Sequence, residues 1–310
     1  MKDMRNRERY KELCKKESTI PLFSQGWWLD AVCGENNWDV YIVGSNMDIK
    51  AAFTYFLQED SEGKYIGRIM LTQNNGIWIK YPDGQGIISR QSYEEKIVNE
   101  ICNFIESLGL IRYEQQYHYN FKNYLPFFWR QYKEIIKYTY VIEDTSDMER
   151  VRQEYSSKLK NVLRKAEKYL HIEEETDIEE FYSINKMSFE RQGIEIPYSF
   201  EYFKKIYNAC MERDSGKLLC ARDSERNTHS VAMLVWDKMS VYYLLNGTNP
   251  DLKQFQGNNL LIDYSIMEAH KRGLKFDFEG SVIKNVNHAF REFGGEPKPY
   301  FRITKEFREG

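Results

Sequence analysis

Two acids near the C-terminus, Asp277 and Glu279, alternate with phenylalanines in the stretch "FDFEGS" (276–281). Successive side chains of a β-strand point to opposite faces, so a strand here places both carboxylates on one side, about 7 Å apart. Either acid could take a proton from an amine or bind its cationic form, and their repulsion raises the affinity of the pair for a proton. The alternative is a structural role, in which they form ion pairs with Arg291 or Lys305.

A second candidate site is the polar loop that opens a helix in "NGTNPDLKQFQGNNLLIDYSIMEAHKRG" (246–273). The backbone N–H groups at the start of a helix are free and carry the positive end of its dipole, so they bind anions, and Gly257 lets the backbone approach a phosphate closely. The candidate ligand-binding residues are Gln254, Gln256, Gly257, Asn258 and Asn259. The alternative is an ordinary polar helix start.

Elements with clear boundaries position both candidates. Asp177 and Ser199 are caps that predict helices running to Gly193 and to about Arg213. A strand "HIEEET" precedes these helices, and three strands in an antiparallel meander follow them. A helix over 257–272, the strand "KFDFEG", a short helix at 286–293 and the strand "PYFRITKEF" complete the order β-α-α-β-β-β-α-β-α-β.

One helix, predicted over 147–170, carries an apolar stripe and otherwise basic faces. These faces either are solvated or contact an anionic ligand or substrate. The basic residues are Lys158, Lys160, Arg164, Lys165 and Lys168.

The N-terminal half is less regular. The pattern predicts helices over 24–34 and 93–109, two strands within 38–60, and strands over 111–118 and 135–143. This half is therefore α+β or α/β, without a defined topology.

Composition limits the class of protein. A chain of 310 residues with 42% hydrophobic and 29% charged residues is long enough for two globular domains, and 15% aromatic residues favour strands. A net charge of −3 gives no overall basic footprint for DNA. Five scattered cysteines without metal-ligand spacing predict free thiols and no metal site. The charged N-terminus and the lack of a membrane-spanning segment predict a cytoplasmic protein.

The order of elements resembles the GNAT acyltransferase superfamily, whose Q/R-x-x-G-x-G/A segment holds the pyrophosphate of acyl-CoA. Gln254, Gly257 and Asn259 fall on the three motif positions, and Asn259 departs from the usual Gly or Ala.

A more specific resemblance covers most of the chain. The segments "KLKNVLRKAEK" (158–168), "FERQGIEIPY" (189–198), "FDFEGS" and "FREFGGEPKPY" (290–300) are similar to the bacterial FemAB-like acyltransferases. This resemblance implies an α/β fold of two tandem GNAT-like domains with mixed sheets. Residues 1–145 would form a degenerate first domain and residues 146–310 the acyltransferase domain, with the site in the cleft between them.

The resemblance also implies direct transfer of an acyl group to an amine or hydroxyl, without a covalent enzyme intermediate. The first choice of donor is acyl-CoA, such as acetyl-CoA, and the acceptor is a small molecule, sugar or cell-envelope precursor. One alternative is an aminoacyl-tRNA-dependent peptidyltransferase of cell-wall precursor synthesis. Another is a catalytically silent ligand-binding module.

Further roles follow from the resemblance, each with a plain structural alternative. Tyr243 could protonate the leaving group or simply pack, and Lys305 could stabilise transition-state charge or lie on an edge strand. Arg191 could bind substrate or stabilise a helix end. The remaining candidate substrate-binding residues are Lys160, Arg164, Ser281 and Arg291. The oligomeric state is open.

Overall fold

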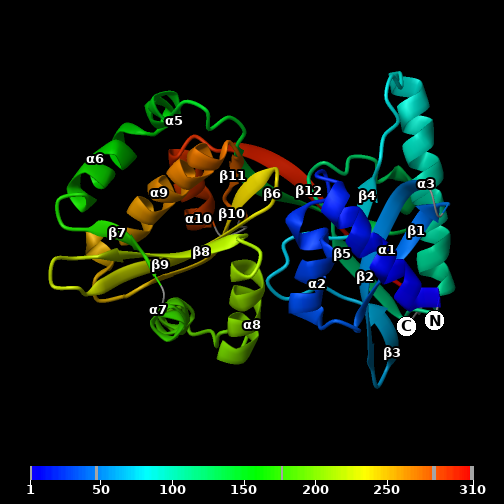
Figure 1. Ribbon diagram of the computed structural model, residues 1–310, viewed down its shortest axis with the longest axis horizontal. Coiled ribbons are helices and arrows are strands. Elements are labelled where there is room, and N and C mark those ends of the chain that lie inside the picture. Colours follow the sequence, from blue (N-terminus) through cyan, green and yellow to red (C-terminus); the bar gives the residue numbers. More distant parts are fainter. Residues whose placement is uncertain (1, 46–47, 176, 281–283, 308–310) are drawn as a thin grey trace. The chain divides into compact units, whose positions relative to one another are not determined.

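A computed structural model describes residues 2–45, 48–175, 177–280 and 284–307 (Figure 1). The chain forms two compact units. Unit 1 comprises Met1–Lys137 and Pro299–Gly310, and unit 2 comprises Tyr138–Lys298. The last residues of the chain thus belong to unit 1, whereas the sequence analysis assigned them to the second domain.

Unit 1 contains a mixed sheet in the order β1-β2-β3-β5-β12. Strand β2 pairs antiparallel with β1 along one edge and with β4 and β3 along the other, and β5 pairs parallel with β3 and antiparallel with β12. The strands are β1 (Trp38–Gly44), β2 (Ile49–Asp60), β3 (Gly63–Ile66), β4 (Ile77–Ile79), β5 (Arg112–Gln116) and β12 (Glu296–Glu306).

Helices pack against the strands of unit 1. Helix α3 (Ile87–Ser107) buries Ile97, Ile101 and Ile105 in one core with Phe53 of β2 and Ile303 of β12. Helices α1 (Lys2–Lys16) and α2 (Gly26–Cys33) contact β1. The single-turn helix α4 (Leu125–Phe128) packs against α3.

Unit 2 contains a sheet in the order β6-β11-β10-β9-β8-β7. All of its pairs are antiparallel except β10 with β11, which is parallel. The strands are β6 (Lys133–Ile142), β7 (His171–Glu174), β8 (Gly216–Arg222), β9 (Thr228–Trp236), β10 (Ser240–Thr248) and β11 (Lys275–Asp277). The predicted antiparallel meander of β8, β9 and β10 is confirmed.

Helices lie on both faces of the unit 2 sheet (Figure 1). One face carries α5 (Met148–Glu154), α6 (Ser157–Ala166), α9 (Gly257–Arg272) and α10 (Lys284–Glu292), whose apolar residues share a core with Tyr243, Phe276 and Phe278. The opposite face carries α7 (Ile178–Glu190) and α8 (Phe200–Met211). The predicted mixed α/β class is confirmed.

The prediction of one helix over 147–170 is wrong, because the helix breaks at Tyr155 and Ser156. Tyr155 has extended backbone angles and ends α5, while the Ser156 hydroxyl accepts the Leu159 N–H and caps α6. Within the described ranges, no helix combines the length and the hydropathy that crossing a bilayer requires.

Candidate active site

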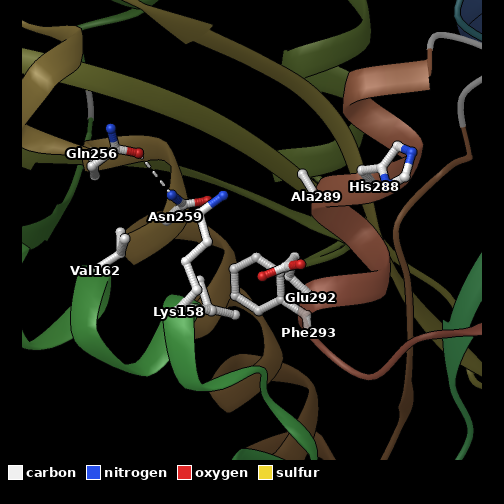
Figure 2. A pocket seen from close by; sticks show the side chains of 9 residues that line it. Lys158, Val162, Gln256, Asn259, His288, Ala289, Glu292 and Phe293 are labelled. Carbon is white, nitrogen blue, oxygen red and sulfur yellow. Dashed lines mark hydrogen bonds between the residues drawn. The ribbon is translucent and has the colours of Figure 1, made fainter.

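The loop between β10 and α9 follows the predicted position closely. A short 3₁₀ turn (Lys253–Phe255) leads to Gln256, whose φ of 63° lies in the left-handed region, and α9 begins at Gly257. The Asn259 amide donates a hydrogen bond of 2.9 Å to the Gln256 side-chain oxygen, which ties the loop to the first turn of α9 (Figure 2). Gln254 is exposed on this loop.

A bulge in β10 positions the next side chain. The register of β10 against β9 shifts between Tyr243 and Leu245, and such bulges redirect side chains near functional sites. The buried Tyr243 hydroxyl donates to the Asn258 side-chain oxygen at 2.9 Å, and burial raises the Tyr243 pKa. Tyr243 therefore holds the start of α9 and stays protonated at neutral pH.

The start of α9 borders a pocket of about 520 Å³ between α6 and α10 (Figure 2). Its wall combines one cation, two amides, one imidazole, one carboxylate and apolar side chains: Lys158, Leu159, Val162, Gln256, Asn259, His288, Ala289, Glu292 and Phe293. Figure 2 shows the Lys158 side chain extending toward Asn259. A phosphate would find the helix dipole and this cation on the same side of the pocket.

The pocket wall contains an acid as well as a cation. Glu292 places a carboxylate in the same wall, although one of its oxygens accepts a hydrogen bond from the Ser156 hydroxyl. The residues therefore fit the phosphates of acyl-CoA at the α9 side of the pocket, and the apolar side chains of Leu159, Val162 and Phe293 fit its less polar parts.

Gly257 has a packing role in addition to the predicted one, which stays a prediction. A Cβ atom there would lie 2.9 Å from the Ser230 hydroxyl oxygen and 3.3 Å from the Ala221 Cβ. Gly257 is buried, and its absent side chain faces the sheet. The glycine is required for α9 to pack against β8 and β9, and this packing sets the position of the helix N-terminus.

Asp277 is the last residue of β11 and is 1% exposed. Its Oδ1 accepts hydrogen bonds from the Thr139 hydroxyl at 2.5 Å and from the Glu279 N–H at 2.8 Å. Its Oδ2 is buried and has no hydrogen-bond partner among the described residues. A buried carboxylate oxygen without a partner is strongly disfavoured unless a proton or ligand occupies it.

Glu279 lies outside the strand, contrary to the prediction that both acids alternate on one strand face. The strand ends at Asp277, and Glu279 has a φ of 65°. Its Oε1 is buried without a partner in the described part of the chain, although the residue as a whole is partly exposed. Gly280 follows, also with a positive φ, where a Cβ would lie 2.3 Å from the Tyr138 carbonyl oxygen.

Burial dominates the electrostatics of these acids. It raises the Asp277 pKa to about 7, against the lowering effect of the hydrogen bonds from Thr139 and the Glu279 N–H. Burial, and then the Asp277 charge, raise the Glu279 pKa well above its ordinary value. Burial therefore disfavours the charged form of both acids, and Asp277, with a pKa of about 7, exchanges its proton readily at neutral pH.

Asp277 and Tyr243 lie on opposite faces of the sheet. Phe276 and Tyr243 share the core under α9, so Asp277 points to the face that carries α7 and α8. Tyr242 is the register partner of Asp277 and shares its face, but its hydroxyl donates to Asp237 at 3.1 Å. The structure therefore does not bring Tyr243 to the acids.

Three of the predicted basic residues each contact a different partner. Lys305 lies in unit 1, where its ammonium contacts Glu106 at 3.2 Å and the Arg130 carbonyl oxygen at 2.9 Å. Lys160 donates to the Gln153 carbonyl oxygen at 2.8 Å, and Arg164 to Asn161 at 3.0 Å.

Two arginines are exposed at helix ends. Arg191 is the C-cap of α7, and Arg291 is in the last turn of α10. Both positions suit the structural alternative, in which a cation complements the helix dipole. Ser281 lies outside the described residues.

Sequence reasoning missed two features. Thr139 orients Asp277 from 138 residues away along the chain, and no local pattern indicates such a contact. In unit 1, the consecutive residues Gln73, Asn74 and Asn75 are buried, and each has a side-chain nitrogen or oxygen without a partner in the described ranges. The polar run "TQNN" between apolar residues was the available signal for this second feature.

Comparison with known protein families identifies a similar domain in this part of the chain. The family model for an acetyltransferase (GNAT) domain matches residues 149–288, which lie within unit 2 and include the α9 loop and the buried acids. This matched segment is similar to GNAT acetyltransferase domains. No curated protein matches its sequence.

Solved structures extend the fold to the whole chain. The crystal structure of FemX aligns with a TM-score of 0.71 at 12% identity over 95% of both chains. A tandem GNAT protein of the clavulanic acid biosynthesis pathway aligns with a TM-score of 0.53 at 9% identity, over 99% of this chain and 97% of that one. The predicted fold of two tandem GNAT-like domains is confirmed.

A third similar structure is the C-terminal DUF2156 domain assigned to a lysylphosphatidylglycerol synthetase of Agrobacterium fabrum. It aligns with a TM-score of 0.58 at 10% identity, over 97% of this chain and 91% of that one. At these identities the likeness concerns the fold.

Proposed function

We propose that the protein transfers an acyl group from acyl-CoA to an amine of a small molecule or cell-envelope precursor, with Asp277 as the proton acceptor. The observation that carries this proposal is the buried Asp277 carboxyl group. One oxygen is fixed by two hydrogen bonds, the other has no partner among the described residues, and the pKa is about 7. A general base works best with a pKa near the operating pH.

Asp277 carries out the proton transfer. An acceptor enters as an ammonium ion, and the Asp277 carboxylate binds it and takes one proton, which leaves a neutral amine nucleophile. Burial and the Asp277 charge both raise the pKa of Glu279, so a second negative charge in the site is disfavoured while Asp277 is ionised. Thr139 keeps Oδ1 occupied, which leaves Oδ2 for the incoming proton.

The phosphates of the donor would bind on the α9 face of the unit 2 sheet, whereas Asp277 points to the opposite face. Strands β10 and β11 pair only as far as Tyr242 and Asp277, so the thioester arm would pass between the strands beyond this point. Bound acyl-CoA would supply an activated thioester carbonyl. As the new C–N bond forms, the C–S bond breaks, and CoA would leave as a thiolate that takes up the second proton lost by the amine nitrogen. Lys158 and the N-terminus of α9 would hold its phosphates. Tyr243 acts here as a positioning residue, because its hydroxyl fixes Asn258 in the first turn of α9.

Direct attack by the acceptor is consistent with the state of the thiols. Burial raises the pKa of the Cys102, Cys210 and Cys220 thiols to about 12, and that of Cys14 to about 11. These four thiols are protonated at neutral pH and are weak nucleophiles.

A thermal-shift titration with CoA and acetyl-CoA tests the donor. Wild-type protein should show a rise in Tm that saturates with ligand concentration. Lys158→Ala should reduce this rise, whereas the matched control Lys165→Ala, an exposed lysine on α6 outside the pocket, should keep it. An unchanged Tm with either ligand would contradict acyl-CoA as donor.

A second candidate donor is aminoacyl-tRNA, which the FemAB-like architecture also supports. The observation that favours it is the series of cations on and after α6: Lys158, Lys160, Arg164, Lys165 and Lys168. Binding to a nucleic-acid backbone through such cations weakens steeply with salt. Salt-dependent filter binding of aminoacyl-tRNA, together with no thermal shift from CoA, would favour this donor.

A further inference from the structure

Helix α4 of unit 1 exposes apolar side chains on one face. Leu125, Phe128 and Trp129 are spaced i, i+3 and i+4, so they lie on the same side of the turn. They are 43%, 53% and 57% exposed, whereas the intervening Pro126 and Phe127 are buried. We call Leu125, Phe128 and Trp129 the α4 apolar face.

The α4 apolar face is rigidly supported. Phe127 is fully buried and packs against Tyr113 and Tyr132, and the Trp129 N–H donates to the Leu125 carbonyl oxygen at 2.9 Å. Arg130 directly after it donates to Glu106 and Asn99 of α3. The exposure of the three side chains therefore belongs to an ordered turn anchored on both sides, and does not reflect a loose end of the chain.

Positive charge predominates in the sequence on both sides of this face. Between residues 122 and 137 the chain has four cations, Lys122, Arg130, Lys133 and Lys137, against the single acid Glu134, although the whole chain has a net charge of −3. Lys122 and Lys133 are exposed. The strand start that follows also exposes Ile135 and Ile136.

We propose that the α4 apolar face is a docking site for the surface of an anionic lipid bilayer. Tryptophan and phenylalanine side chains partition into the interfacial region of a bilayer, where the indole N–H keeps a polar partner. Lysines beside them are attracted to anionic headgroups, although the rest of the chain is repelled. This combination of exposed aromatic residues and the exposed lysines Lys122 and Lys133 favours a membrane over an uncharged protein surface. The inference is independent of the proposed transfer reaction.

A matched control lies elsewhere on unit 1. Ile87 and Ile88 at the start of α3 are 79% and 81% exposed, more than any residue of the α4 apolar face, and neither is aromatic. Asn99, which Arg130 contacts, is about 18 Å further along α3 by helical rise. Replacing both Ile87 and Ile88 therefore removes exposed apolar surface without altering the α4 apolar face.

Co-sedimentation with vesicles of phosphatidylcholine, with or without phosphatidylglycerol, tests the proposal. Wild-type protein should bind the vesicles that contain phosphatidylglycerol. Phe128→Ser/Trp129→Ser should weaken this binding about tenfold, while Ile87→Ser/Ile88→Ser should leave it unchanged. Lys122→Glu/Lys133→Glu, which keeps the apolar face, should abolish the preference for anionic vesicles. Thermal unfolding of each variant establishes that it is folded.

Other outcomes would overturn the proposal. Wild-type protein that stays in the supernatant with both kinds of vesicle does not dock on lipid. If Ile87→Ser/Ile88→Ser weakened binding as much as Phe128→Ser/Trp129→Ser, binding would depend on exposed apolar side chains in general and not on the α4 apolar face. Light scattering that shows a dimer, converted to a monomer by Phe128→Ser/Trp129→Ser, would assign the face to a second copy of the chain.

Discussion

At the scale of residues, Asp277 joins burial, an oriented oxygen and a raised pKa in one side chain. Asp277→Asn keeps an oxygen for the Thr139 hydroxyl and the Glu279 N–H but has no basic group. We expect a loss of about 10²–10⁴-fold in kcat, the usual contribution of a general base. In the wild type the rate should fall as pH drops through about 7, because only the carboxylate accepts a proton. The pH profile of acyl transfer measures both effects.

Thr139→Val provides a control for this interpretation. The Thr139 hydroxyl lowers the Asp277 pKa, so its removal should move the acid limb of the pH profile to higher pH while the rate at high pH largely persists. A uniform loss of rate at every pH would assign Thr139 to structure rather than to proton transfer.

Ionisation of Asp277, which the proposed activity requires, should lower the stability of the folded chain. The pKa of Asp277 is about 7 in the folded chain and about 4 in an unfolded chain, so the folded state binds more protons between these values. The free energy of unfolding should therefore fall as pH rises from about 4 to 7, by this contribution. Asp277→Asn should flatten that slope and raise Tm at pH 8. Thermal unfolding across the pH range measures it, and an unchanged slope would contradict the raised pKa.

At the scale of elements, the packing of α9 depends on one missing side chain. Gly257→Ala would place a Cβ 2.9 Å from the Ser230 hydroxyl oxygen. We expect a loss of about 1–3 kcal/mol in the free energy of unfolding, as for other overpacked sites. Chemical denaturation measures this loss, and the double variant Gly257→Ala/Ser230→Ala should recover part of it. Full stability of Gly257→Ala would instead indicate that α9 can shift freely.

The elements that could be predicted from sequence are those whose signals are local. Asp177 and Ser199 cap α7 and α8 through bonds to N–H groups two or three residues away. The break between α5 and α6 was hidden because the apolar stripe continues through it: Tyr155 is buried with Leu159.

The candidate site was predictable only in part, for a similar reason. The positions of Asp277 and of the α9 loop follow from chain order. The contacts that decide their chemistry are distant in sequence: Thr139 on Asp277, and Ser230 on Gly257. The left-handed backbone of Glu279 had no local signal, since the residue is not a glycine.

At the scale of the whole molecule, unit 1 is built from two distant pieces of chain. Ile303 of β12 is 1% exposed in its core, and β12 pairs with β5. Ending the chain after Lys298 should therefore disorder unit 1 more than unit 2, whose residues are continuous. Hydrogen exchange should show lost protection in β5 and α3, with β8, β9 and β10 still protected. Equal loss in both units would indicate that they unfold as one.

The return of the last strand to unit 1 has a consequence for synthesis. A ribosome releases residues 138–298 before residues 299–310, so unit 2 can close its core while unit 1 still lacks β12. Most chains fold their N-terminal part first during synthesis. In this protein the N-terminal unit must wait for the final residues, and during that interval the β5 edge lacks its β12 partner. Nascent chains stalled before residue 299 should accordingly be the species most dependent on chaperones.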